Sequence, residues 1–281
     1  MFSSTDIATY YEQSHPHYVQ HWQLQRHQAM HYGLWWPDTQ SFGEALMNTH
    51  RLLAQWAQIE PVDHVFDAGC GTGGSIRWML REVGCQVTGL TLSPRQAELG
   101  RQVLAAEPNA DQAQVAVGDF TRTDFPSRQF DVVWAIESVC HAPDKAAFLA
   151  EAYRLLRPGG RLVLCDFFRS DQSPTVAGAR VLRQWLDSWA IDSLSTQRRF
   201  VQTAHEVGFT DLHARDLTEA ITPSARRLYR RFQLGLPVQK LYEWLGNPTL
   251  VQRRSVRSAR WQWEALQAGT WRYAMVAGRK R

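Results

Sequence analysis

Two side chains that can move protons, Glu137 and His141, stand four residues apart. Carboxylates and imidazoles are common general acids and bases near neutral pH. Both follow the apolar run 130–136, which is typical of a buried strand. If a helix begins after that strand, the spacing places both side chains on one face. We therefore take both as catalytic candidates. The alternative is that Glu137 stabilises a helix N-terminus and His141 makes a structural hydrogen bond.

A second candidate site is the glycine-rich run DAGCGTGG, which begins at Asp67. Glycines let the backbone turn tightly and approach a ligand closely. Gly69, Gly71 and Gly74 also fit the G-x-G-x-x-G pattern of nicotinamide enzymes. Asp67, two residues before the first glycine, would repel a pyrophosphate and suits a cofactor with an ammonium group. The run predicts cofactor binding, with a nicotinamide enzyme as the less favoured alternative.

Strands and helices alternate along the middle of the chain and set where these candidates lie. The segments expected as strands are 62–69, 85–91, 113–119, 130–136 and 161–168. The helices expected between them cover about 74–83, the stretch from Ser93-Pro94 onward, and 144–156, which the turn 157–160 ends. This order predicts a doubly wound α/β fold with a mostly parallel sheet. Ligands of such folds bind at the carboxyl ends of strands, here near Gly69, Thr91, Asp119 and Ile136.

The remaining segments complete the sheet and add two helical parts. Helices at about 176–191 and 197–207 and strands at 209–217 and 270–278 bring the sheet to seven strands. Residues 1–58 are expected to form a helical N-terminal cap. Residues 219–269 exceed what a hairpin needs and predict a helical lid over the acceptor. We expect a single domain over 1–281, with an α/β core of 59–218 and 270–281.

Four ordered motifs between about residues 60 and 170 resemble those of the class I methyltransferases. FDAGCGTGG is similar to their first motif, GDF and FDVVWAIES to their adenine-binding and post-fourth-strand segments, and LLRPGGRLVL to the motif before their fifth strand. The resemblance implies S-adenosylmethionine as cofactor. It implies that Gly69 and Gly71 line its methionine and ribose parts, that Asp67 organises its amino group, and that Asp119 and Phe120 hold its adenine.

A narrower resemblance is to the sterol, tocopherol and cyclopropane (mycolic acid) synthase branch. The second strand ends in GLTLS followed by Gln96, without the usual acidic residue for the ribose. The branch resemblance implies that Thr91 and Gln96 replace that acid; Asp63 and Glu82 are poorer candidates, since neither lies at a strand's carboxyl end. It also assigns cofactor contacts to Leu92 and Ala135. MHYGLWW at 30–36 is similar to the branch's capping segment, which implies that His31 and Tyr32 face the cofactor carboxylate.

Composition and charge limit the kinds of binding partner that we expect. The net charge of +4 comes almost entirely from arginine, concentrated at 226–231 and 253–260, which is either compositional bias or a site for an anion or RNA. No nucleic-acid-binding module is recognisable, so no nucleic-acid partner is expected. No apolar run reaches the roughly 18 residues of a membrane span, and the N-terminus lacks signal-peptide features, so we expect no stable membrane insertion and a cytoplasmic protein. Four cysteines without a CxxC motif predict free thiols.

Two histidine pairs at helical spacing, His17 with His21 and His27 with His31, lack a nearby Glu or Cys, so no metal is expected. Twelve tryptophans are unusual, and five fall outside the α/β core: Trp185, Trp189, Trp244, Trp261 and Trp263. They either pack the helices of the lid or line an aromatic pocket that can stabilise a cation.

The function that these features predict is methyl transfer to a small, largely apolar metabolite such as a terpenoid, sterol, prenylated quinone or polyketide. In the resembled branch an E-x-x-x-H element serves near a carbocation or holds an anion that accepts a proton, and this favours carbon as the acceptor atom. The alternatives are O- or N-methylation with His141 as base, a cyclopropane-synthase-like reaction, RNA methylation, and a non-catalytic cofactor-binding protein. The oligomeric state stays open.

Overall fold

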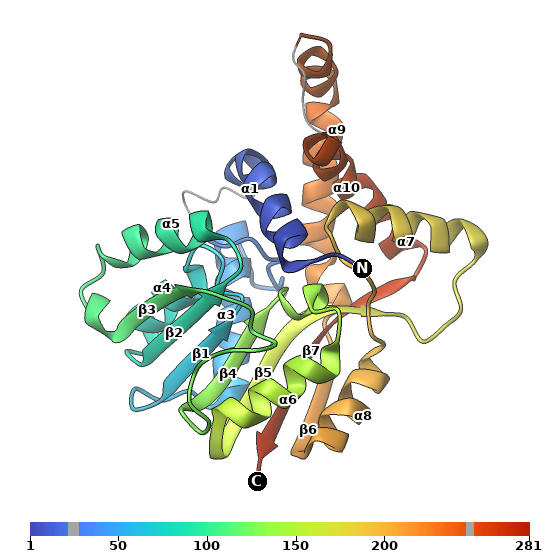
Figure 1. The fold of residues 1–281 in the computed structure, drawn as a ribbon. Coiled ribbons are helices and arrows are strands. Elements are labelled where there is room, and N and C mark those ends of the chain that lie inside the picture. Colours follow the sequence, from blue (N-terminus) through green and yellow to red (C-terminus); the bar gives the residue numbers. More distant parts are fainter. Residues whose placement is uncertain (22–27, 246–249) are drawn as a thin grey trace.

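The computed structural model describes residues 1–21, 28–245 and 250–281, and their side chains outside 15–21, 237–252 and 255. Seven strands form one sheet in the order β3-β2-β1-β4-β5-β7-β6 (Figure 1). Their bounds are β1 His64–Ala68, β2 Gln86–Thr91, β3 Ala113–Val117, β4 Phe130–Ile136, β5 Leu156–Arg169, β6 Phe209–Asp216 and β7 Trp271–Lys280. β7 alone runs antiparallel to its neighbours β5 and β6. The predicted doubly wound, mostly parallel seven-stranded sheet is confirmed.

Alternating side chains of the central strands feed two separate cores. Val65 packs into the core on one face of the sheet, and the next residue, Phe66, packs into the other. The first core includes residues of α3 (Phe42–Ala57), α4 (Gly74–Glu82) and α5 (Pro94–Leu104). The second includes residues of α6 (Lys145–Leu155) and α8 (Gln197–Val207). Helices on both faces therefore bury the central strands β1 and β4 almost completely, as continuous apolar strands require.

Polar side chains begin the helices at the positions that the sequence indicates. Ser93 accepts a hydrogen bond from the backbone N–H of Gln96, and Pro94 opens α5. Asp144 caps α6 in the same way, and Thr175 caps α7 (Val176–Ser188). The predicted helix starts are confirmed here, because an N-cap depends only on local sequence.

The turn expected at 157–160 lies instead within a strand. β5 already begins at Leu156, which pairs with Phe130, and the register then shifts so that Val132 pairs with Arg161. Gly159 takes the left-handed backbone conformation, with φ of 78°, inside this irregularity. Residues 158–160 thus interrupt the regular pairing between β4 and β5, but β5 continues through them.

The first fifty-odd residues divide between two roles. α1 (Ser4–His21) lies over the carboxyl edge of the sheet (Figure 1). α3, by contrast, packs against β5 and β7 and belongs to a layer of the sandwich. Of the stretch 1–58 expected as a helical cap, α1 and α3 are helical, while residues 28–41 form no helix. The expectation that no metal binds at His17, His21 and His27 concerns side chains that lie outside the described ones.

The long insertion between β6 and β7 forms two helices, α9 (Thr218–Leu245) and α10 (Leu250–Gln267), which extend as a pair away from the sheet (Figure 1). α10 packs against α7, α9 and α1. No helix within the described ranges is long and apolar enough to cross a membrane. The described His, Cys, Asp and Glu residues form no group of three that could hold a metal. All four cysteines are buried free thiols.

Tryptophans outside the α/β core pack a buried aromatic cluster. Trp185 of α7 and Trp189, which follows that helix, contact Phe167 edge-on at 5.3 and 5.9 Å between ring centroids. The centroid of the Trp271 ring lies 5.0 Å from that of Trp185. Trp263 stacks on Tyr229 between α10 and α9. The side chain of Trp244 lies outside the described ones. These contacts favour helix packing over an aromatic pocket.

Trp185→Ala tests that interpretation, because this side chain is 0% exposed. Removing a buried tryptophan from a close-packed core costs about 3–5 kcal/mol. We expect a loss of that size in the free energy of unfolding, measured by urea denaturation, and a loss below 1 kcal/mol for Trp56→Ala, since Trp56 is 37% exposed. Equal, small losses for both variants would contradict the packing role.

Candidate active site

A cavity with about 780 Å³ of empty space, partly open to solvent, lies at the carboxyl ends of β1, β2 and β4 beneath α1. Ten residues that the sequence singles out lie in its wall: His31, Asp67, Gly69, Gly71, Thr91, Leu92, Gln96, Phe120, Glu137 and His141. The fold therefore brings together side chains up to 110 positions apart in the sequence.

The glycine turn after β1 forms the floor of this cavity. The backbone N–H groups of Gly69 and Cys70 both donate to the Leu90 carbonyl, at 3.0 and 2.9 Å, which ties the turn to β2. Gly69 and Gly71 have φ of 99° and 54°, values that side chains disfavour. A Cβ at Gly69 would overlap the Ser138 side chain, and one at Gly71 would lie 2.9 Å from Met30 Cε. The turn leaves its backbone bare for a ligand.

Asp67 places a carboxyl group in the wall without a neutralising partner. Its Oδ2 is buried and has no hydrogen-bond partner. Burial raises the pKa of this carboxyl to about 7. A ligand ammonium group beside Oδ2 would supply both the missing hydrogen bond and the opposite charge. This orphaned oxygen fits the amino group of S-adenosylmethionine and would repel a pyrophosphate.

Neutral polar groups occupy the end of β2, where an acid would be usual. Thr91 Oγ1 donates to Gln96 Oε1 at 2.7 Å, and Gln96 Nε2 lies 4.0 Å from Met30 Sδ. Asp63 pairs with Arg161 at 2.6 Å and does not line the cavity. Thr91 and Gln96 are thus the polar groups available here to a ribose.

Three predicted cofactor residues do not line the cavity: Tyr32, Asp119 and Ala135. The Tyr32 hydroxyl donates to Gln262 Oε1 on α10, and its ring packs edge-on against Phe167. Ala135 is buried within the sheet. Tyr32 points away because its backbone N–H, not its side chain, faces the site. That N–H donates to Glu137 Oε1 at 2.7 Å.

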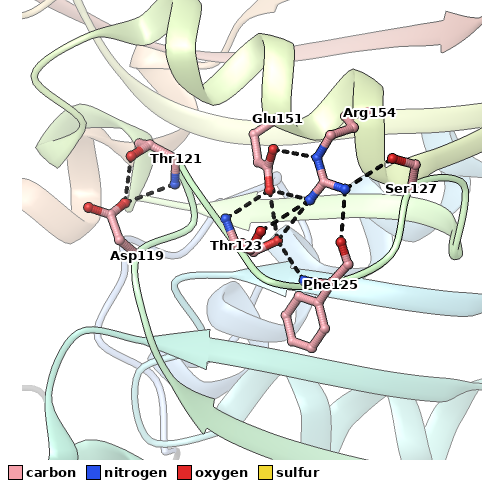
Figure 2. Close-up of polar contacts among 7 residues, drawn as sticks. All are labelled: Asp119, Thr121, Thr123, Phe125, Ser127, Glu151 and Arg154. Atoms are coloured by element: carbon pink, nitrogen blue, oxygen red, sulfur yellow. Dashed lines mark hydrogen bonds and ion pairs between the residues drawn. The ribbon is translucent and has the colours of Figure 1, made fainter.

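Asp119 binds the protein itself in this structure. Its Oδ1 accepts from the Thr121 backbone N–H and hydroxyl at 2.8 and 2.7 Å (Figure 2). Its Oδ2 accepts from Ser4 on α1 at 3.1 Å. Further along the loop, Glu151 accepts from Thr123, and Arg154 donates to Glu151 and to the Phe125 carbonyl (Figure 2). These contacts hold the loop that places the Phe120 ring in the cavity wall.

The segment after β4 does not begin an α-helix, so the condition under which the spacing of four would place both side chains on one face is not met. Glu137 has φ of 50°, and only Val139–His141 form a turn of 3₁₀-helix. The turn is fixed from below, because Asp166 Oδ2 accepts from the Cys140 N–H at 2.9 Å and Lys145 Nζ donates to the Cys140 carbonyl. Glu137 and His141 nevertheless both reach the cavity. The left-handed backbone of Glu137, rather than helical spacing, accompanies the placement of both side chains in one wall.

Burial sets the protonation of both catalytic candidates. It raises the pKa of Glu137 to about 8, against the opposing effects of the Tyr32 N–H and the Tyr273 hydroxyl. It lowers the pKa of His141 to about 4; Lys145 adds to this effect, while the Ala190 backbone opposes it. Near pH 7 the protein therefore holds a largely protonated Glu137 and a neutral imidazole at His141. A neutral imidazole can accept a proton.

Comparison with known proteins agrees with this geometry. Residues 66–164 match a family described as "Methyltransferase domain". The chain is 30% identical to the sarcosine/dimethylglycine N-methyltransferase of Halorhodospira halochloris over 202 residues, which are 72% of this chain and 71% of that protein. The chain belongs to the class I S-adenosylmethionine-dependent methyltransferases. The nicotinamide-enzyme alternative is thereby excluded.

Other relatives of this methyltransferase differ in what their names say they modify. It is 34% identical to the 2-methyl-6-phytyl-1,4-hydroquinone methyltransferase of Synechocystis over 62% of this chain and 56% of that protein. The match to a probable tocopherol O-methyltransferase of Oryza sativa covers 45% of that protein, so the chain spans about half the length of these two relatives. The cyclopropane synthase MmaA2 of Mycobacterium tuberculosis shares the fold, with a TM-score of 0.84, 18% identity and 99% of each chain covered. The names of these relatives differ in substrate, so the comparisons leave the acceptor of this methyltransferase open.

The sequence by itself did not identify the residues that α1 contributes to the cavity wall. Ile7 and Tyr11 line the cavity, and the Tyr11 hydroxyl lies 2.9 Å from His141 Nε2. No motif marks either residue, because their role depends on α1 folding over the strand ends. It also missed His50, whose Nε2 lies 3.2 Å from His31 Nε2. Burial lowers the pKa of His31 to about 4, so this pair is uncharged near neutral pH.

Gly71→Val tests the glycine turn. A branched side chain at this positive φ would strain the backbone and enter the cavity. We expect calorimetry to show no binding of S-adenosylhomocysteine. Gly84→Val is the matched control, because Gly84 has φ of 77° with no atom within 4 Å of a built Cβ. Unchanged affinity in Gly71→Val, or equal losses in both variants, would contradict the assignment of this turn.

Asp67 should make cofactor affinity depend on pH. A ligand ammonium group favours the ionised carboxyl, so below the raised pKa of about 7 each binding event must release a proton from Asp67. We expect the Kd of S-adenosylhomocysteine to rise up to about tenfold for each pH unit below 7. Asp67→Asn should bind weakly with a flat profile between pH 5 and 7. A wild-type profile that is also flat would show that Asp67 is not the titrating partner.

Proposed function

We propose that this methyltransferase modifies a small, largely apolar acceptor, with His141 acting as base through Tyr11. The observation that carries the proposal is the contact of 2.9 Å between the Tyr11 hydroxyl and His141 Nε2 in the cavity wall. The names of relatives that act on a phytyl hydroquinone and on tocopherol are consistent with an acceptor of this class.

The walls of the cavity favour an apolar acceptor over a charged one. Around the catalytic candidates they are built from the side chains of Ile7, Met30, Leu92, Phe120 and Ile136. Among the described residues that line the cavity, none is Lys or Arg. An acceptor carboxylate, as in sarcosine, would therefore be desolvated there without a cation to compensate it.

The proton can leave the acceptor through a two-residue relay. S-adenosylmethionine supplies, when bound, a methyl group on a sulfonium that leaves as a neutral thioether. The lone pair of the acceptor forms the new bond to the methyl carbon. The acceptor proton passes to the Tyr11 oxygen while the Tyr11 proton passes to His141 Nε2, so that charge and atoms balance. His141 is neutral at pH 7 and so can accept this proton, as a weaker base than a free imidazole.

We further propose that α1, and not the α9–α10 pair, closes this site. α1 supplies Ile7 and Tyr11 to the wall, whereas no described residue of 218–267 lines it. Ser4 bonds to Asp119, and the Phe2 N–H donates to Asp192, so the start of α1 is held at both sides of the opening. A closed α1 excludes water from the reacting atoms. The α9–α10 pair then acts by supporting α1 through α10.

A second candidate is carbon methylation through a cation, and the position of Glu137 favours it. Its carboxyl lies in the same wall as His141 and lacks an opposing cation. A cationic intermediate would favour its ionised form, which could then remove a proton from carbon. In this case Glu137, rather than Tyr11, completes the reaction.

The acceptor must be found before the mechanism can be tested. Radiolabelled S-adenosylmethionine is incubated with the enzyme and a crude lipid and metabolite extract, and the labelled product is identified by mass spectrometry. We expect label in the organic phase. Label confined to RNA or to water-soluble amino acids would contradict an apolar acceptor, and cofactor binding without turnover would support a non-catalytic protein.

Tyr11→Phe, His141→Ala and Glu137→Gln separate the two candidates. If the relay is correct, the first two lower kcat by about 10²–10⁴ and Glu137→Gln has little effect. Raising the pH should partly restore His141→Ala. Under the cation candidate, Glu137→Gln and His141→Ala both lower the rate and divert product to an alcohol or rearranged alkene. Tyr10→Phe, one position away and outside the cavity wall, is the control. Losses below tenfold for every variant would leave catalysis to alignment alone.

A further inference from the structure

Four arginines lie within six residues of α9. They form two pairs with a spacing of four residues, Arg226 with Arg230 and Arg227 with Arg231. Like charges four residues apart on a helix repel each other and destabilise it. Among the described residues, neither Arg226 nor Arg230 has a carboxylate partner. This group of four arginines, called the arginine row below, is therefore destabilised by repulsion. At Arg226 and Arg230 no described carboxylate offsets that repulsion.

The four arginines line one hollow on the outside of the molecule. It holds about 760 Å³ of empty space, open to solvent, and its other walls are Trp35, Pro223 and Leu234. None of these seven residues is acidic, and none lines the cavity beneath α1. The hollow is thus a separate, uniformly positive depression.

Aromatic rings hold two of the guanidinium groups in place. Arg227 lies 4.1 Å from the centroid of the Phe42 ring, and Arg226 lies 5.8 Å from that of Trp263. A guanidinium on an aromatic face keeps its N–H edge free for an anion and loses little conformational entropy when it binds one. Burial and the neighbouring Arg231 lower the pKa of Arg227 to about 10, so it stays charged at neutral pH.

We propose that this hollow is a binding site for a phosphate group. A phosphate carries up to two negative charges and several acceptor oxygens, which match guanidinium forks that converge from one helix face. Bound phosphate would relieve the repulsion along α9. The phosphate can belong to a free molecule or to a lipid headgroup, and Leu234, which is 82% exposed at the edge of the hollow, would lie beside the acyl part of a lipid.

The site is mechanically linked to the cofactor cavity. Ser224 on α9 accepts from the Trp35 indole at 2.9 Å and from the Gly33 N–H at 3.2 Å. The Trp35 N–H donates to the Ala220 carbonyl. Segment 30–36 thus joins the arginine helix to Met30 and His31 in the cavity wall.

The test compares Arg226→Gln/Arg230→Gln with Arg180→Gln/Arg198→Gln, which removes two charges from exposed positions on α7 and α8. Inorganic pyrophosphate binding is measured by calorimetry. Vesicles of phosphatidylglycerol with phosphatidylcholine, and of phosphatidylcholine alone, are used in flotation. We expect the wild type and the control to bind pyrophosphate or the anionic vesicles at least tenfold more tightly than the α9 variant. Which of the two probes binds identifies the source of the phosphate.

Thermal unfolding shows whether the α9 variant is folded. Because the repulsive pair Arg226–Arg230 loses both charges, the Tm of this variant without ligand should equal or exceed that of the wild type. Three results would overturn the proposal: no binding of either probe by the wild type, equal losses in the α9 and control variants, or an α9-specific loss of binding to a single-stranded RNA but to neither phosphate probe.

Discussion

The backbone turn that joins β1 to α4 is the constraint on which the site depends. Gly69, Gly71 and Gly73 all have φ between 54° and 99°, where L side chains are strained. This conformation lets two successive N–H groups share the Leu90 carbonyl and leaves room for Ser138 against Gly69. The end of β4 can therefore lie directly beside the end of β1. Asp67, Glu137 and His141 share one wall only because no side chain separates these strand ends.

That close approach also explains the electrostatics of the cavity. Asp67, Glu137, His31 and His141 are all buried, and burial shifts the pKa of each group toward its neutral form. The site thus carries little net charge before its ligands arrive. A cationic cofactor would restore the charge of the carboxyl groups nearest to it, while the imidazoles remain available as bases. Binding of a cationic cofactor in such a cavity is therefore coupled to the loss of protons from the buried carboxyl groups.

The arginine row is kept apart from the reacting groups. It lies on the outer face of α9, and the described residues in the walls of the cavity include no arginine or lysine. Trp35 and Ser224 connect the two regions through hydrogen bonds. One helix pair can therefore support α1 through α10 and present a positive surface to the outside without altering the pKa values at the cavity.

Local sequence determined the succession of strands and helices along the chain, the helix caps, the glycine turn and ten residues of the cavity wall. These features follow from periodicity, capping and motifs that act over a few residues. Tertiary structure alone decided the rest. Tyr11 reaches His141 only because α1 folds back over the strand ends, across 130 positions of sequence. Tyr32 turns away because Gln262 and Phe167 bind its side chain. The segment after β4 forms no α-helix because Glu137 takes a left-handed conformation, fixed by contacts with distant residues such as Tyr32. Sequence patterns report which face of an element is apolar, but not which distant element covers it.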